Sequence, residues 1–231
     1  MMNDDRKTAE NSVLQASWLF KSIEHAGSNL EILSDISMDI AAGSTVSMTG
    51  PSGSGKTTLL GILAGLDLPS SGSITLLGQT ISTMDEDQRA KLRNGRVGFV
   101  FQSFHLLPNL TALENISLAL EVMSGSQDIR ERSVQSLQSV GLSDRASHLP
   151  SQLSGGEQQR VALARSMVVN PAILFADEPT GNLDHQTSRQ IVDLMFSLVE
   201  QRGSTLVLAT HDHQLAERCD VRYRIEAGQL A

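Results

Sequence analysis

Short apolar runs predict strands at several points along the chain. Near the start they lie at Ser12–Leu19, Leu30–Ser37 and Ser44–Thr49, with turn residues between them. Later runs lie at Arg96–Phe101, Ala172–Ala176 and Thr205–Ala209. The run at 172–176 is wholly apolar, as expected for a buried parallel strand. We also expect a final hairpin at Ala227-Gly228 and a frayed segment over residues 1 to about 11.

Apolar residues spaced at i, i+3, i+4 and i+7 predict helices between these strands. The first such face consists of Leu59, Ile62, Leu63 and Leu66. Further amphipathic segments lie at Leu110–Met123, Ile129–Val140, Glu157–Val169 and Gln186–Gln201. Strands that alternate with helices indicate an α/β domain, and the mostly helical stretch 103–168 suggests an inserted subdomain.

Composition narrows the class of protein. A hydrophobic fraction of 40% in 231 residues permits a sizeable core, and a net charge of -8 argues against a basic nucleic-acid footprint. We therefore expect no nucleic-acid partner. The single cysteine, Cys219, allows no intrachain disulfide and suggests a reducing compartment. Without a signal peptide or a run of 18 apolar residues, any membrane role is expected to come through a partner.

A glycine-rich loop separates the third predicted strand from the first predicted helix. Its residues match the phosphate-loop pattern in full: Gly50-Pro51-Ser52-Gly53-Ser54-Gly55-Lys56-Thr57. The glycines let successive backbone N–H groups point at one anion, and the helix adds its positive dipole end. We expect Lys56 to reach the β- and γ-phosphates, Thr57 to hold Mg²⁺ and Thr58 to contact a phosphate. A plain glycine-rich turn is the alternative.

Two carboxylates follow the apolar run at 172–176. Ligands of α/β proteins bind at the carboxyl ends of strands, so Asp177 is placed to hold Mg²⁺, through water, beside Thr57. Glu178 follows directly and is the candidate base for an attacking water. A solvated acidic turn before Pro179 is the alternative, which the upstream phosphate loop disfavours.

A second predicted anion site is Leu153-Ser154-Gly155-Gly156-Glu157-Gln158-Gln159-Arg160. Ser154, Gly155 and Gly156 open a helix, so free N–H groups and a hydroxyl face outward. A serine-capped helix start with Glu157 in its first turn explains the serine and the glutamate, but it does not explain the two glycines. Because this helix start belongs to a separate helical segment, we expect it to reach ATP bound to a second copy of the chain.

LSGGEQQR is identified as the signature motif of ABC transporter ATP-binding subunits, and the chain resembles that family over essentially its whole length. The resemblance implies an ATPase that uses ATP and Mg²⁺ in a nucleotide-sandwich homodimer. Gln102 resembles the Q-loop glutamine, which contacts Mg²⁺ or the attacking water. His211 resembles the switch histidine, which holds the γ-phosphate and the water. Gly181-Asn182-Leu183-Asp184 resembles the D-loop, which couples the two sites.

The resemblance therefore implies a set of site residues. The catalytic ones are Glu178, His211 and Gln102, and the metal ligands are Thr57, Gln102 and Asp177. Beyond the phosphate loop and Thr58, the nucleotide-binding residues are Ser154, Gly155, Gly156, Glu157 and Asp184.

The resemblance also implies the fold. It is a P-loop NTPase (RecA-like) α/β core with an N-terminal antiparallel β subdomain and an inserted helical signature subdomain. We expect a single ABC ATPase domain over 1–231. Its ATP-binding core and β subdomain would take 12–102 and 169–231, and its helical subdomain 103–168.

Local strings resemble the group that includes the lipoprotein-releasing ATPase LolD, the macrolide exporter MacB and the division protein FtsE. They are Leu63–Asp67, Gly98–Gln102 and Phe175–Asp184. Leu60–Gln79 and Phe99–Phe104, with Leu113-Glu114-Asn115, look closest to YbbA-type ATPases. Such ATPases pair with FtsX/MacB-type permeases, which handle lipids, lipoproteins or other hydrophobic compounds.

The resemblance also suggests a location and a contact surface. We expect the chain on the cytoplasmic face of the bacterial inner membrane, attached through a permease that docks in a groove along Gln102–Leu107. Subdomain core is the alternative for that stretch.

One position departs from the family pattern. ABC ATPases usually place an aromatic side chain in the N-terminal loop to stack on adenine, and counting back from Ile32-Leu33 puts Ile23 there. Isoleucine forgoes about 1 kcal/mol of stacking. Trp18 or Phe20 could compensate, although both are expected to belong to the strand core. The site is therefore expected to hold the phosphates more firmly than the base.

Other functions are also compatible with parts of the sequence. The FtsE resemblance allows mechanotransmission without transport. A soluble ABC ATPase of DNA repair or translation usually carries tandem domains or long insertions, and this chain has neither. A regulatory module that no longer hydrolyses ATP is disfavoured by Gln102, Glu178 and His211.

Overall fold

The computed structural model describes residues 11–25, 28–123, 125 and 127–231, so most of the segment predicted to be frayed lies outside the described residues. The chain divides into two compact units. Unit 1 comprises Met1–Arg93 with Thr205–Ala231, and unit 2 comprises Asn94–Ser204. The predicted boundaries of the helical subdomain, at 102/103 and 168/169, are a different division of the chain and stay a prediction.

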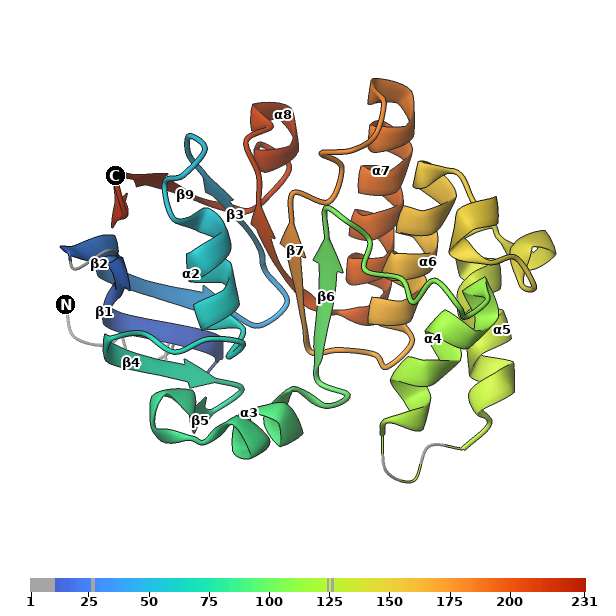
Figure 1. Cartoon of the computed structure of the whole chain (residues 1–231), viewed down its shortest axis with the longest axis horizontal. Helices are drawn as coiled ribbons and strands as arrows, with labels where there is room; N and C mark the ends of the chain where they lie inside the picture. Colours follow the sequence, from blue (N-terminus) through green and yellow to red (C-terminus); the bar gives the residue numbers. More distant parts are fainter. Residues whose placement is uncertain (1–10, 26–27, 124, 126) are drawn as a thin grey trace. The chain divides into compact units, whose positions relative to one another are not determined.

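Unit 1 contains an antiparallel sheet in the strand order β2-β1-β4-β5. The strands are β1 (Ser12–His25), β2 (Ser28–Ala41), β4 (Ser71–Leu76) and β5 (Gln79–Thr80) (Figure 1). Leu14, Leu19 and Ile36 are completely buried and form part of the core. The predicted strands at 12–19 and 30–37 are confirmed but too short, because the pairing of β1 with β2 continues to His25 and Ser28.

A bulge in β1 turns Trp18 outward. The register between β1 and β2 shifts between Ala16 and Leu19, and Trp18 has a φ of 53°. Trp18 is 67% exposed and Phe20 37% exposed, whereas Leu19 between them is buried. The prediction that both aromatic side chains belong to the strand core is therefore wrong, because a bulge changes which residues face inward.

The second sheet of unit 1 is built around β3 (Thr45–Thr49). β3 pairs in parallel with β8 (Thr205–Ala209) and with β9 (Val221–Glu226). β10 (Gln229–Leu230) pairs with β9 in the predicted hairpin. Every residue of β8 is buried, which confirms the predicted buried strand. Helix α2 packs on β8, and α8 (His213–Ala216) packs on β3.

Helix α2 (Lys56–Leu63) ends earlier than its apolar pattern predicts. Gly65 has a φ of 70°, its N–H donates to the Ile62 carbonyl, and the Leu66 N–H donates to the Gly61 carbonyl. This pair of bonds is the Schellman motif, which terminates a helix at a left-handed glycine. Leu66 is therefore exposed beyond the helix end, and its predicted place on the helical face is wrong.

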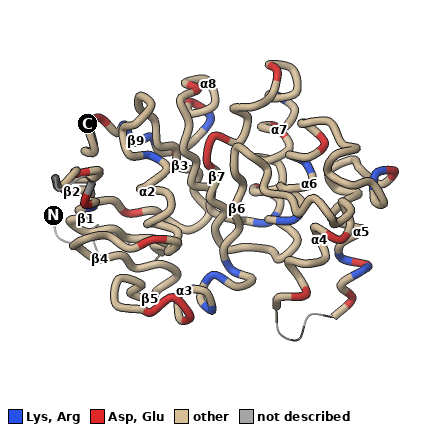
Figure 2. Tube along the Cα trace, viewed as in Figure 1, with Lys and Arg blue, Asp and Glu red and all other residues tan. Residues whose placement is uncertain are grey.

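Helix α3 (Glu86–Arg93) buries a single apolar side chain, that of Leu92, and was not predicted. Acidic residues occupy its first turn and basic residues its last, an arrangement that the helix dipole favours. Figure 2 shows both charge signs along it. Glu86 pairs with Arg89 and with Arg93, and both arginines donate to the Gly65 carbonyl. These polar contacts tie α3 to the end of α2.

Unit 2 combines two parallel strands with helices. The strands are β6 (Val97–Phe101) and β7 (Ile173–Asp177), and the helices are α4 (Ala112–Glu121), α5 (Ile129–Ser139), α6 (Gly155–Met167) and α7 (His185–Arg202) (Figure 1). All four helices were predicted, and each of their ends lies within two residues of the predicted one. Phe175 of β7 is fully buried and stacks on Phe99 of β6 with 5.6 Å between ring centroids. Helix α6 packs on β6, α4, α5 and α7, and is thus central to the unit.

Candidate functional site

The phosphate loop of unit 1 depends on glycine at its two ends. Gly50 has a φ of 154°, and a Cβ there would lie 2.1 Å from the Ile225 carbonyl oxygen. Gly55, with a φ of 102°, is the N-cap of α2, and a Cβ there would lie 2.8 Å from Leu33 Cδ2. Because the N-cap is a glycine, the first turn of α2 has no side-chain cap, an arrangement that suits a helix start that binds an anion.

Polar groups inside this loop suit a phosphate ligand. Lys56 is buried, and its Nζ donates to the Gly50 carbonyl at 2.9 Å and to the Pro51 carbonyl at 3.0 Å. The hydroxyl of Ser54 is buried and has no hydrogen-bond partner among the described residues. With the helix N-terminus, these groups form a donor set that fits ATP phosphates. Ser52 and Gly53 lie on the exposed rim, and Thr57 and Thr58 in the first turn of α2.

His211 lies at the same sheet edge as the phosphate loop. Strands β3 and β8 are parallel and in register at Met48 and Ala209, and the Thr210 N–H donates to the Met48 carbonyl at 3.0 Å. The residues that follow the two strands, Gly50 and His211, therefore share one carboxyl edge. Both predicted residues are brought together within unit 1.

A second carboxyl edge lies in unit 2. Parallel strands β6 and β7 are in register at Phe101 and Asp177. Gln102 directly follows the first strand, and Glu178 directly follows the second. The structure therefore brings Gln102, Asp177 and Glu178 to a common edge.

Gln102 is held by a residue that was not among the predicted site residues. Its side-chain Nε2 donates to Asn182 Oδ1 at 3.2 Å, and Asn182 Nδ2 donates to the Gln102 carbonyl at 3.0 Å. This reciprocal pair joins the Q-loop to the D-loop across 80 residues of sequence. The presence of Asn182 in the motif Gly181–Asp184 was the available signal for it.

Glu178 has an unusual backbone conformation. Its φ is 45°, which is uncommon for a residue other than glycine and is found mostly at functional sites. The Gly181 N–H donates to the Glu178 carbonyl at 3.0 Å and closes a turn that contains Pro179. The side chain of Glu178 is half-buried.

The signature motif begins helix α6 with a reciprocal cap. The Glu157 N–H donates to Ser154 Oγ at 3.3 Å, and the Ser154 N–H donates to Glu157 Oε2 at 2.8 Å. Arg145 Nε donates to Glu157 Oε1 at 2.8 Å. The bonds from Arg145 and from Ser154 lower the pKa of Glu157 to about 2.

The two glycines of the signature motif differ in how closely neighbouring residues of unit 2 approach them. A Cβ at Gly156 would lie 2.5 Å from Thr187 Cγ2, so a larger residue there would displace α7. At Gly155 the nearest atom, Leu183 Cδ2, would lie at 3.3 Å. Packing against α7 and the D-loop thus explains part of the need for glycine.

Asp184 caps helix α7. Its Oδ1 accepts from the backbone N–H groups of Gln186 and Thr187, each at 3.0 Å. Hydrogen bonds from Thr187 lower the pKa of Asp184. A cap is therefore the role that the contacts give to this residue, and its contact with nucleotide stays a prediction.

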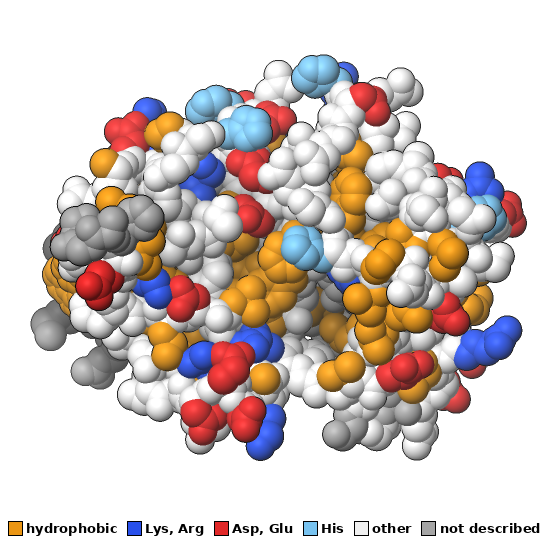
Figure 3. Space-filling model, viewed as in Figure 1, with side chains coloured by type: hydrophobic (Ala, Val, Ile, Leu, Met, Phe, Trp, Pro, Cys, Tyr) orange, Lys and Arg blue, Asp and Glu red, His pale blue; other side chains and the backbone are white. Residues whose placement is uncertain are grey.

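The loop that follows Gln102 is held in shape by α6. Phe104 and His105 have φ values of 59° and 50°. Arg165 of α6 donates to their carbonyls at 3.0 and 2.7 Å. Leu107 beyond them is 43% exposed. Figure 3, viewed from the same side as Figure 1, shows hydrophobic side chains gathered over the helical part of unit 2.

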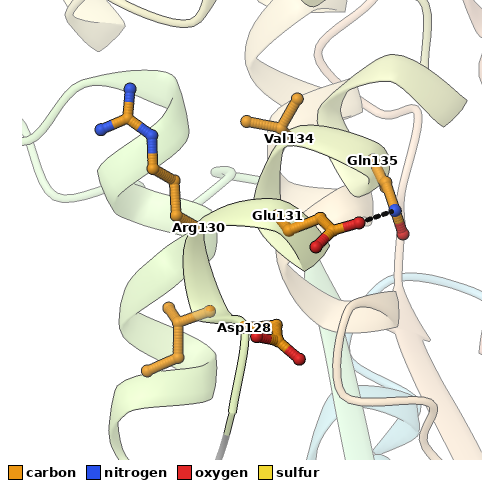
Figure 4. A pocket seen from close by; sticks show the side chains of 6 residues that line it. Asp128, Arg130, Glu131, Val134 and Gln135 are labelled. Carbon is orange, nitrogen blue, oxygen red and sulfur yellow. Dashed lines mark hydrogen bonds between the residues drawn. The ribbon is translucent and has the colours of Figure 1, made fainter.

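A separate hollow of about 540 Å³ lies at the start of α5 (Figure 4). It is lined by Asp128, Ile129, Arg130, Glu131, Val134 and Gln135. Gln135 Nε2 donates to Glu131 Oε1 at 3.2 Å. None of the lining residues belongs to a nucleotide motif, so this hollow is not the ATP site.

The described residues contain no group of three or more His, Cys, Asp or Glu that could hold a metal ion. The predicted Mg²⁺ ligands are of a different kind, since Thr57 and Gln102 offer neutral oxygens and only Asp177 a carboxylate. A hydroxyl, an amide and one carboxylate suit an ion that also binds phosphate oxygens. No helix within the described part of the chain is long and apolar enough to cross a bilayer.

Glu157→Gln tests the ion pair at the signature helix. Because the folded pKa of about 2 lies below the ordinary value of 4.5, the carboxylate stabilises the fold above about pH 4.5, and this contribution is lost as pH falls toward 2. We expect Glu157→Gln to lower the free energy of unfolding by about 1 kcal/mol at pH 7 and by less at pH 3, as measured by urea denaturation. Exposed Glu121→Gln is the control. An equal loss at both pH values would contradict the assignment.

Comparisons with known proteins identify the family. The family model described as ABC transporter matches residues 33–181. The ABC transporter ATP-binding protein YbbA of Escherichia coli K12 is 52% identical over 223 residues, covering 96% of this chain and 97% of that protein. The lipoprotein-releasing system ATP-binding protein LolD of Legionella pneumophila strain Paris is 44% identical over 220 residues, covering 94% of this chain and 96% of that protein.

Solved structures confirm the α/β P-loop NTPase fold. A dimeric post-hydrolysis state of the ATP-binding cassette MJ0796, bound to ADP and Pi, matches with a TM-score of 0.88 and 37% identity, covering 94% of this chain and 96% of that one. With the phosphate loop, the signature helix and the paired acidic residues present together, the chain belongs to the ABC transporter family, as an ATP-binding and ATP-hydrolysing subunit that uses Mg²⁺.

Proposed function

We propose that two copies of the chain close on two ATP molecules, each lying between Lys56 of one copy and Ser154 of the other. The phosphate loop belongs to unit 1 and the signature helix to unit 2. The first turn of α2 has no side-chain cap, and at α6 the Ser154 side chain caps the Glu157 N–H. The dimeric state of the MJ0796 cassette, with ADP and Pi bound, supports this arrangement. Ser154, Gly155, Gly156 and Glu157 would contact the ATP of the partner copy.

The observation that carries the catalytic part of the proposal is the shared edge of β6 and β7. It groups one amide and two carboxylates, from Gln102, Asp177 and Glu178, at the carboxyl ends of parallel strands, where α/β enzymes bind ligands. Thr57, Gln102 and Asp177 would hold Mg²⁺, which neutralises phosphate charge when bound. Lys56 and the N–H groups of the loop would hold the phosphates.

Glu178 would take the proton from the attacking water. Its carboxylate follows the Mg²⁺-binding Asp177 directly, and its half-buried side chain leaves it accessible to water. His211, at the carboxyl edge beside the phosphate loop, would hold the γ-phosphate and orient the water. Most of the rate enhancement then comes from electrostatic positioning.

We further propose that the dimer drives an FtsX/MacB-type permease at the cytoplasmic face of the inner membrane. The identity to YbbA and LolD supports this partner, and the lipoprotein-releasing function of LolD supports a lipid, lipoprotein or other hydrophobic cargo. The loop Gln102–Leu107 would receive the permease. Its shape is set by Arg165, and it ends in the exposed side chain of Leu107.

Mechanotransmission without transport is the alternative in the same family. The two differ in outcome, since only a transporter moves cargo when the ATPase and its permease are reconstituted in liposomes. ATP-dependent release of a lipoprotein from such liposomes would support transport, and ATP turnover without release would favour mechanotransmission.

Glu178→Gln tests the proposed base. The amide keeps the shape of the side chain but cannot accept a proton, so turnover should fall by at least about 100-fold while ATP binding persists. Size-exclusion chromatography with ATP should then show a stable dimer. Full phosphate release by Glu178→Gln would contradict the assignment of the base.

A photo-crosslinking residue at Leu107 tests the docking surface. Illumination of membranes should join it to an integral membrane protein, because this loop is proposed to receive the permease. The same residue placed at Val122, which is 65% exposed at the end of α4, is the matched control and should give no such product. Equal crosslinking from both positions would count against the loop as the contact site.

A further inference from the structure

We propose that Gln159 of α6 is a positioning residue for Glu178, acting through the backbone of the turn that carries it. This inference rests on the proposed role of Glu178 as the base. Gln159 is completely buried, and its Nε2 donates to the Pro179 carbonyl oxygen at 2.5 Å. Pro179 is the residue directly after Glu178.

The buried amide is a poor choice for packing alone. Gln159 Oε1 is buried and has no hydrogen-bond partner among the described residues. A buried polar atom without a partner is unfavourable, and an apolar side chain of similar length would avoid this cost. The bond from Nε2 to Pro179 is what glutamine adds to the position.

The turn at Glu178 and Pro179 needs an outside contact to fix its conformation, because of the properties of these two residues. Pro179 has no N–H, so the peptide between Glu178 and Pro179 cannot donate a hydrogen bond. Glu178 has a left-handed φ of 45°, a conformation that a glutamate does not prefer. The Glu178 carbonyl already accepts from the Gly181 N–H, so the carbonyl of Pro179, in the next peptide, is the group through which α6 holds the turn beside Glu178.

The turn is held from two sides within unit 2. Gln159 of α6 holds Pro179, and Gln102 pairs with Asn182 at the other end. Loss of the first contact leaves the second in place. Removing Gln159 should therefore loosen the orientation of the Glu178 carboxylate without unfolding the turn.

Gln159→Glu gives a readout that a purely structural role would not produce. The side chains have the same shape, but an ionised carboxylate cannot donate to Pro179, whereas a protonated one can. Burial raises the pKa of a carboxyl group, so the protonated form should be populated near neutral pH. The kcat of Gln159→Glu, relative to wild type, should be about tenfold lower at pH 8 and recover toward pH 6, with the KM for ATP changed little.

None of the charged groups described near position 159 supplies a donor to the Pro179 carbonyl in place of residue 159. On α6, Glu157 is paired with Arg145, and Arg160 donates to the Val140 carbonyl and to Gln190. On the turn itself, the Glu178 carboxylate would raise the pKa of an introduced glutamate further. At the start of α7, the Asp184 carboxylate accepts two backbone N–H groups.

Two further variants separate positioning from stability. Gln159→Met keeps the bulk but has no donor, so its kcat should be low at every pH. Ser136→Ala removes another buried hydrogen bond to α6, from Ser136 Oγ to the Ala164 carbonyl at 3.0 Å, and should keep the wild-type kcat and pH profile. Melting temperatures of all variants show how much stability each has lost.

The results can distinguish this inference from the proposed function. Wild-type kcat and pH profile in both Gln159 variants would overturn the inference, as would a loss of kcat in Ser136→Ala equal to theirs. If Glu178→Gln is inactive while the Gln159 variants behave as wild type, only the inference fails. If Glu178→Gln stays active, the assignment of the base fails and the inference fails with it.

Discussion

Parallel strand pairing decides which loops of this protein can act together. The register of β3 with β8 brings the phosphate loop and His211 to one edge of unit 1. The register of β6 with β7 brings Gln102 to the edge that carries Asp177 and Glu178 in unit 2. A shift of either register by one residue would turn the side chains of the shifted strand to the opposite face of the sheet and separate them from the groups on its neighbour. The buried, apolar strands therefore fix the chemistry as well as the core.

Helix α6 connects the segments of unit 2 that are proposed to act on ATP and on the permease. Its N-terminus carries Ser154, and its middle holds the Pro179 carbonyl through Gln159. Nearer its end, Arg165 holds the carbonyls of Phe104 and His105. A rigid helix moves these contacts together. Displacement of one segment is thus expected to be felt at the others.

The sequence was most informative where a residue type is demanded by local chemistry. The glycines of the phosphate loop, the apolar run before Asp177 and the Ser154–Glu157 cap all stand at the places where the structure has them. Strand β4 was missed because few of its residues are buried, and α3 because Leu92 is its one buried apolar residue. The outward turn of Trp18 depends on a bulge, which alternation of apolar residues does not reveal.

Contacts between distant segments could not be predicted. The pairing of Gln102 with Asn182 and the bond from Gln159 to Pro179 depend on how β6, α6 and β7 pack, and the sequence pattern indicates only that each segment exists. The first contact holds the Gln102 side chain, and the second is proposed to orient Glu178. The residues that make these contacts, Asn182 and Gln159, lie within the D-loop and signature motifs, yet the motifs alone did not indicate what their side chains hold.

The claim that ATP is held between two copies is tested most directly by mixing two variants that are each inactive alone. Lys56→Ala removes a phosphate contact, and Ser154→Arg blocks the signature helix. In a mixed dimer, the intact Lys56 of one copy faces the intact Ser154 of the other. About half of the dimers are then mixed, with one intact site of two, so ATPase activity of roughly a quarter of wild type is expected. No gain in activity on mixing would contradict a shared site.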